Sequence, residues 1–147
     1  MKKEIVILIV ITSILVLALS FLNKNKQDKI APKILKIGGI TLNIEVANTD
    51  AERVQGLSGR SGLSENGGML FVFDNEGYYG FWMKDMNFPI DMAWLDKNKQ
   101  IINIESNISP ATYPQVFNPP APSLYVLEVS AGFLSKNNIK IGDFVAF

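Results

Sequence analysis

The stretch formed by residues 68–95 constrains the fold more than any other part of the chain. It holds two apolar runs rich in aromatic residues, 68–74 and 81–95, and both tryptophans of the sequence. Between the runs lies Asn75-Glu76-Gly77, a composition typical of turns. Short apolar runs separated by turn residues predict a pair of strands in a β-rich domain.

The segments on either side of this stretch also favour short strands. Gly38-Gly39 can supply the positive φ angles of a tight hairpin turn between residues 34–37 and 40–47. Thr49 or Asp50 can cap a short helix that has Glu52 in its first turn. After residue 95, the pattern predicts strands at 101–105, 123–130 and 144–147, and one or two helical turns at 131–138.

One segment does not fit an ordinary connection between strands. Residues 107–123 contain five of the seven prolines, which predicts either a functional loop or a mobile one. For residues 33–147 as a whole, the patterns predict one mainly β domain with one or two short helices. A length of 147 residues is consistent with a single folded domain.

The amino terminus reads as a membrane segment. Residues 5–22 carry no charge, and a helix of this length spans roughly 27 Å, close to the hydrocarbon core of a bilayer. An uncleaved anchor would use the whole run, whereas a signal peptide would be cleaved at Ala18-Leu19-Ser20. Residues 23–32 form a polar tether. Both interpretations place the domain outside the cytoplasm, either anchored to the membrane or secreted.

Composition excludes several classes of function. Residues 1–29 hold five lysines and two acidic residues, whereas the remainder holds nine basic and twelve acidic residues. A mildly acidic domain argues against a nucleic-acid partner. The chain has neither Cys nor His, which removes disulfides, thiolate and imidazole metal ligands, and the common nucleophilic triads. No cofactor and no metal site are predicted.

Five segments together resemble a known family. They are ERVQGLSGR at 52–60, GMLFVFD at 68–74, FWMKDMNFPIDMAWL at 81–95, YVLEVSAG at 125–132 and GD at 142–143. In order and spacing they are similar to the prokaryotic family called domain of unknown function 192. The resemblance implies a compact, mostly antiparallel β-barrel or sandwich with short helices, often behind a signal peptide or an anchor. It implies no established activity.

Polar residues within the apolar runs are the candidates for a binding site. A buried charge without a partner is costly, so such groups either pair with one another or face a pocket. We expect Lys84, Asp91 and Glu128 to lie near one another, with positive charge from Arg53 or Arg60. Trp82 beside Lys84 would suit a surface that stacks on sugars or other planar groups. The predicted ligand-binding residues are Arg53, Arg60, Trp82, Lys84, Asp91 and Glu128.

Three functional hypotheses follow from these residues. The first is a non-catalytic, monomeric binding module outside the cytoplasm, whose ligand is a small molecule or an envelope glycan. The second is a hydrolase of envelope material, with Asp91 and Glu128 as the acid and the base. The third is a structural or protein-interaction role with the proline-rich loop as the contact. Without His or Cys, catalysis is the less favoured class.

Overall fold

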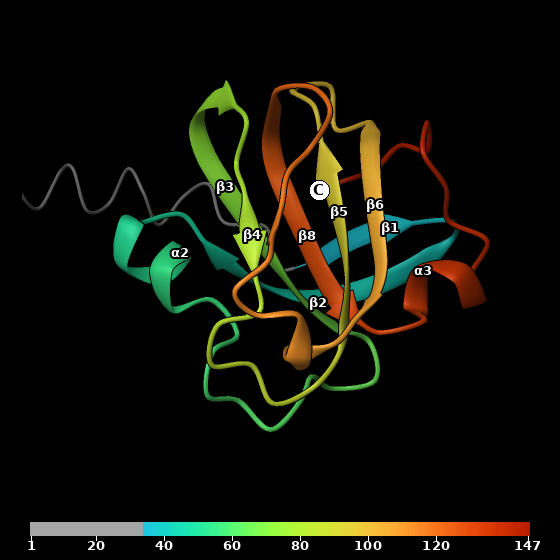
Figure 1. The fold of residues 1–147 in the computed structure, drawn as a ribbon. Helices are drawn as coiled ribbons and strands as arrows, with labels where there is room; N and C mark the ends of the chain where they lie inside the picture. Colours follow the sequence, from blue (N-terminus) through green and yellow to red (C-terminus); the bar gives the residue numbers. More distant parts are fainter. Residues whose placement is uncertain (1–33) are drawn as a thin grey trace, which may run out of the picture. The chain divides into compact units, whose positions relative to one another are not determined.

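The computed structural model describes residues 34–147, which form a six-stranded sheet and a smaller two-stranded sheet (Figure 1). The strands of the larger sheet lie in the order β1-β2-β3-β8-β5-β6, and β4 pairs with β7. All pairings are antiparallel except that of β2 with β3. The predicted membrane segment and the polar tether lie outside the described residues.

The first hairpin confirms the prediction from Gly38-Gly39. Strands β1 (Ile34–Ile37) and β2 (Ile40–Ala47) pair antiparallel across the two glycines, both of which have positive φ. This is the conformation that a two-residue turn needs and that side chains disfavour. Along β2, Leu42 and Ile44 are buried while their neighbours are exposed, as the alternation predicts.

Helix α2 (Asp50–Gln55) connects β2 to its parallel neighbour β3 (Gly67–Gly77). Its amino terminus is fixed locally, because the Thr49 side chain accepts from the Glu52 backbone N–H while the Glu52 carboxylate accepts from the Thr49 N–H. This reciprocal arrangement is a capping box, so the predicted helix start is confirmed.

The predicted pairing between the two apolar runs of residues 68–95 is wrong. Residues 75–77 belong to β3 rather than to a turn, and β3 pairs with β2 and β8. The second run divides into β4 (Phe81–Trp82), a loop, and β5 (Ile90–Leu95). Pairing with β8 buries β3 and β5 on both of their faces, which a local hairpin would not achieve.

Strand β8 (Ser123–Ser130) has the predicted bounds and lies between β3 and β5. Its alternating side chains divide the core into two clusters. Leu127 and Val129 pack on one face of the sheet with Leu70 and Leu95, whereas Val126 packs on the other face. The second cluster contains Phe71, Met92 and Trp94 and borders the pocket described below.

The edge of the larger sheet is strand β6 (Ile101–Ile108), longer than the predicted strand at 101–105. The proline-rich segment that follows is folded, because it contains a short 3-10 helix η1 (Pro110–Thr112) and strand β7 (Val116–Phe117). Strand β7 pairs with β4 and so holds the segment that carries Trp82.

The carboxy-terminal part of the chain contains helix α3 (Phe133–Lys136), within the predicted helical turns. Residues 144–147 form isolated bridges to Lys36 and Gln100 rather than the predicted strand. The mainly β class is confirmed, but the ladder of described strands ends at β1 and β6 and does not close into a barrel. No helix within residues 34–147 has the length and apolar character needed to span a membrane.

Candidate functional site

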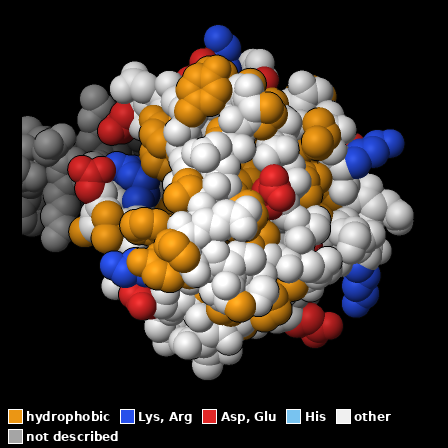
Figure 2. Space-filling view, viewed as in Figure 1, with side chains coloured by type: hydrophobic (Ala, Val, Ile, Leu, Met, Phe, Trp, Pro, Cys, Tyr) orange, Lys and Arg blue, Asp and Glu red, His pale blue; other side chains and the backbone are white. Residues whose placement is uncertain are grey.

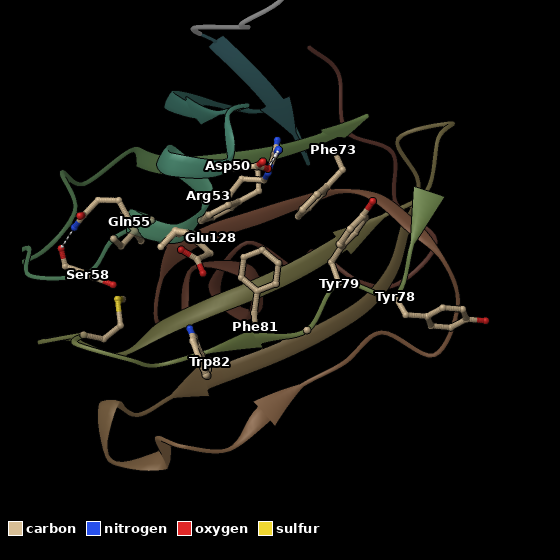
Figure 3. A pocket seen from close by; sticks show the side chains of 16 residues that line it. Asp50, Arg53, Gln55, Ser58, Phe73, Tyr78, Tyr79, Phe81, Trp82 and Glu128 are labelled. Atoms are coloured by element: carbon tan, nitrogen blue, oxygen red, sulfur yellow. Dashed lines mark hydrogen bonds and ion pairs between the residues drawn. The ribbon is translucent and has the colours of Figure 1, made fainter. Parts of the chain in front are cut away.

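A pocket of about 500 Å³ lies between α2, the segment that follows it, β3 and the segment leading into β4. Its lining is mainly apolar and aromatic, and Figure 3 shows the side chains around it. The size is typical of sites for small organic molecules. The aromatic lining residues are Phe71, Phe73, Tyr78, Tyr79, Phe81 and Trp82.

Glu128 lines this pocket and is the only acidic residue of β8. Its exposed fraction is 5%. In the view of Figure 3, its carboxyl group lies between Arg53 and Trp82, next to the ring of Phe81. Burial raises the pKa of Glu128 from 4.5 to about 8, because the low-polarity surroundings disfavour the charged form. At neutral pH the carboxyl group is therefore mostly protonated.

The register of the sheet sets this position. Glu128 is opposite Met69 on β3 and opposite Met92 on β5, so its neighbours across both ladders are uncharged. Gly68 lets β3 approach closely here, since a Cβ atom at Gly68 would lie 2.9 Å from the carbonyl oxygen of Glu128. None of the hydrogen bonds and ion pairs found among residues 34–147 includes the Glu128 carboxyl group. Every fully enclosed side-chain polar atom of these residues has a hydrogen-bond partner, so the carboxyl oxygens of Glu128 open onto the pocket instead of being sealed in the core.

One wall of the pocket is a stack of planar groups. The rings of Phe73 and Tyr79 are parallel, with centroids 3.5 Å apart, and the Arg53 guanidinium lies 5.3 Å from the Phe73 centroid. Phe81 meets Phe71 edge to face at 4.8 Å. Stacked and edge-to-face contacts are the arrangements that aromatic pairs prefer, so each ring of the wall is stabilised by its neighbours.

Arg53 is held by the protein itself. Its guanidinium donates to the backbone carbonyls of Asn48 and Val72 at 2.8 and 2.7 Å, and it forms an ion pair with Asp50. The ion pair with Asp50 offsets the positive charge of Arg53, and the bond to Val72 connects α2 to β3. Arg53 therefore lines the pocket as part of its wall, with its guanidinium bonded to the protein.

The loop after β4 is bonded to the segment after α2. The Ser58 hydroxyl donates to the Lys84 carbonyl at 3.0 Å, and the Gly59 N–H donates to the Asp85 carbonyl at 2.8 Å. Asn87 donates to the carbonyl of Arg60 at 2.9 Å. These bonds place Ser58 at the pocket and connect the two motifs ERVQGLSGR and FWMKDMNFPIDMAWL.

Asp91 lies away from the pocket. On β5 it is opposite Val129, whereas Met92 is opposite Glu128, so the two acidic side chains lie on opposite faces of the sheet. Asp91 is fully buried, and its carboxylate accepts from the backbone N–H groups of Asn107, Gly132 and Leu134 at 2.8 to 3.0 Å. It ties β6 and the start of α3 to β5. The expected convergence of Lys84, Asp91 and Glu128 is therefore wrong.

The remaining predicted residues lie at the surface. Trp82 is 51% exposed at the pocket rim, and the Lys84 ammonium lies 5.9 Å from its ring centroid. Figure 2 shows hydrophobic side chains gathered on the surface beside α2 and β4. Arg60 forms a bidentate pair with Glu45, which raises the pKa of Arg60 and lowers that of Glu45. This pair lies outside the pocket.

The structure therefore brings together Arg53, Trp82 and Glu128 from the predicted set. Sequence reasoning missed Phe73, Tyr79 and Phe81, whose aromatic character gives no signal that separates a pocket wall from the core. Within residues 34–147, no group of three or more His, Cys, Asp or Glu residues is arranged to hold a metal ion.

The comparisons with known proteins give a family and a fold. The model of the family DUF192, described as "Uncharacterized ACR", matches residues 33–147, which confirms the resemblance seen in the motifs. A protein of unknown function from Novosphingobium aromaticivorans DSM 12444 is 28% identical, with a TM-score of 0.74 over 78% of this chain and 84% of that chain. A protein described as a "putative transcription regulator" from Sinorhizobium meliloti 1021 is 28% identical, with a TM-score of 0.72 over 77% and 89%. The search of curated proteins found no match.

Proposed function

The chain belongs to the DUF192 family, and from that premise we propose that its domain binds a small organic molecule in the pocket beside Glu128. The carboxyl group of Glu128 carries this proposal. The side chain is buried, has no hydrogen-bond partner among the described residues, and its carboxyl oxygens open onto the pocket. A polar group in such surroundings is costly unless something in the cavity completes its hydrogen bonds.

The aromatic lining supports the same function. A ligand in this pocket would contact the flat rings of Phe73, Tyr79 and Phe81 while the Glu128 carboxyl group bonds its polar part. Small-molecule sites commonly combine a mostly apolar lining with a few polar groups that fix orientation. A planar ring or one face of a sugar fits this lining, so the ligand is a small molecule or a short piece of envelope glycan.

Binding is a better match to the pocket than hydrolysis. Acid–base hydrolysis of a glycosidic bond needs two carboxyl groups on either side of the substrate. Only Glu128 of the predicted pair lines the pocket, because Asp91 is bonded to backbone N–H groups on the other face. The proposal is therefore a receptor that holds its ligand without converting it.

Ligand-observed NMR with a panel of soluble aromatic and sugar fragments tests this function. We expect at least one fragment to bind the full chain and the Glu128→Leu variant to bind it about tenfold or more weakly, since a lost hydrogen bond to a buried group costs about 1–3 kcal/mol. Glu65→Gln is the matched control, because Glu65 is exposed and does not line the pocket. If no fragment distinguishes the wild-type chain from Glu128→Leu, the pocket is not a binding site.

The proposal includes a location outside the cytoplasm. The uncharged run of residues 5–22 and the lysines before it support an uncleaved anchor. We expect the intact mass of protein purified from membranes to equal that of a chain that retains this run. A mature chain that begins near Phe21 and is found in the soluble fraction would instead identify a cleaved signal peptide.

A further inference from the structure

We infer that the ligand of this pocket is a small organic cation, whose substituted ammonium group lies between the carboxylate of Glu128 and the surrounding aromatic rings. This inference rests on the proposed function and names the chemical class of its ligand. It follows from three features of the pocket: the aromatic lining, the charges already present, and the missing partner of Glu128.

The aromatic lining is the first feature. Aromatic rings carry negative charge on their faces and attract ammonium and guanidinium groups, and quaternary ammonium ligands are commonly bound by several such rings. Two cationic side chains of the protein already lie over rings of this pocket. The Arg53 guanidinium is 5.3 Å from the Phe73 centroid, and the Lys84 ammonium is 5.9 Å from the Trp82 centroid. The rings of Tyr79 and Phe81 complete the wall around Glu128. The lining thus has the chemistry of a cation site.

The charges around the pocket are the second feature. On α2, Asp50 and Arg53 form an ion pair, and Arg53 also donates to two backbone carbonyls. Both charged groups of α2 at the pocket therefore already have partners within the protein. Tyr78 and Tyr79 are the other titratable residues of the lining. Across the ladders, the partners of Glu128 are methionines, and Asp91 lies on the opposite face of the sheet. No cation of the described chain therefore neutralises an ionised Glu128.

The third feature is the proton that Glu128 holds when the pocket is unliganded. Burial raises its pKa to about 8, so at lower pH a cation must displace this proton before it can pair with the carboxylate. The proton is released to the solvent or buffer as the ligand binds. Affinity for a cation should therefore rise with pH up to about 8 and level off above it. A neutral ligand that accepts a hydrogen bond from the acid would show the opposite trend.

Choline and 3,3-dimethyl-1-butanol form a suitable pair of probes. The two have the same shape, but the first carries a permanent positive charge where the second carries a neutral carbon. Isothermal titration calorimetry of the full chain at about pH 9 should give at least about tenfold tighter binding of choline, because cation–π and carboxylate contacts act on the charged probe alone. Toward about pH 6 this preference should shrink to the part that the aromatic rings supply, as Glu128 takes up its proton.

The Glu128→Gln variant is the matched control in the same preparation. It keeps the shape of the side chain and the aromatic rings but cannot ionise, so its choline affinity should fall by the carboxylate contribution and lose its pH dependence. Equal binding of both probes to the wild-type chain at about pH 9, or a choline affinity that is unchanged in Glu128→Gln, overturns the cation inference. Absence of choline binding also overturns it. The fragment panel then decides separately whether the pocket binds neutral molecules, so the proposed function stands or falls on its own result.

Discussion

Replacing Glu128 with glutamine is expected to stabilise the folded protein at alkaline pH by about 5 kcal/mol, the free energy that corresponds to a pKa rise from 4.5 to about 8. The wild-type chain loses this stability on ionising a carboxyl group that the fold holds in apolar surroundings. Glutamine has nearly the same shape and no charge, so it avoids the loss.

The pH window follows from the two pKa values. Below about pH 4.5 the carboxyl group is protonated in both the folded and the unfolded chain, and its contribution to stability does not depend on pH. Between 4.5 and about 8, the unfolded chain releases a proton that the folded chain keeps, so the free energy of unfolding falls by about 1.4 kcal/mol per pH unit. Above about 8 the loss is complete.

Urea melts of the wild-type chain and Glu128→Gln at several pH values check this expectation. The two proteins should have similar stability near pH 4, and the variant should gain steadily as the pH rises. Glu65→Gln is again the control, since Glu65 is exposed and should show no such trend. A stability difference that stays constant from acid to alkaline pH would show that Glu128 does not titrate in buried, apolar surroundings.

Replacing Asp91 has the opposite expected effect, a large loss of stability at neutral pH. In Asp91→Ala, the backbone N–H groups of Asn107, Gly132 and Leu134 lose their acceptor. An unsatisfied donor in a buried site costs about 1–3 kcal/mol, so we expect a total loss of about 5 kcal/mol. In Asp91→Asn the amide oxygen keeps part of the network, but its NH₂ group faces a backbone donor, and we expect a loss of about 3 kcal/mol.

The control for this pair of variants is Asp74→Asn on β3. Asp74 is exposed and forms no side-chain hydrogen bond or ion pair with another residue of 34–147, so its replacement should change stability by less than about 0.5 kcal/mol. Urea denaturation followed by far-UV circular dichroism measures all three variants. An Asp91→Asn protein within about 0.5 kcal/mol of the wild type would show that the three backbone contacts do not hold α3 and β6 in place.

Asp91 and Glu128 show how much of the site could be predicted from the sequence. Each interrupts an apolar run, which made both candidates for groups that pair or face a pocket, and the structure buries both. It also suggested that they converge, with Lys84 as the opposite charge. Alternation along one strand says only that neighbouring side chains point to opposite faces. The register between β5 and β8 decides which residues share a face, and it separates Asp91 from Glu128.

The aromatic wall of the pocket could not be predicted from the sequence for a related reason. Phe73, Tyr79 and Phe81 come from β3, from the turn after it and from β4, and they meet Arg53 of α2 only in the folded chain. A buried aromatic side chain has the same sequence signature whether it fills a core or lines a cavity. Trp82 and Arg53 do line the pocket, but they were chosen from the sequence for stacking beside Lys84 and for positive charge, and neither signal locates a cavity.

What the sequence by itself determined is therefore local. The Gly38-Gly39 turn and the capping box of Thr49 and Glu52 depend on backbone conformations and hydrogen bonds within a few residues. The bounds of β8 follow from the apolar run of its own sequence. The tertiary structure alone decided that β3 pairs with β2 and β8 instead of with the following run, and that Glu128 faces the pocket. Strand pairing depends on how much apolar surface each arrangement buries across the whole sheet, and that sum is not a property of any single segment.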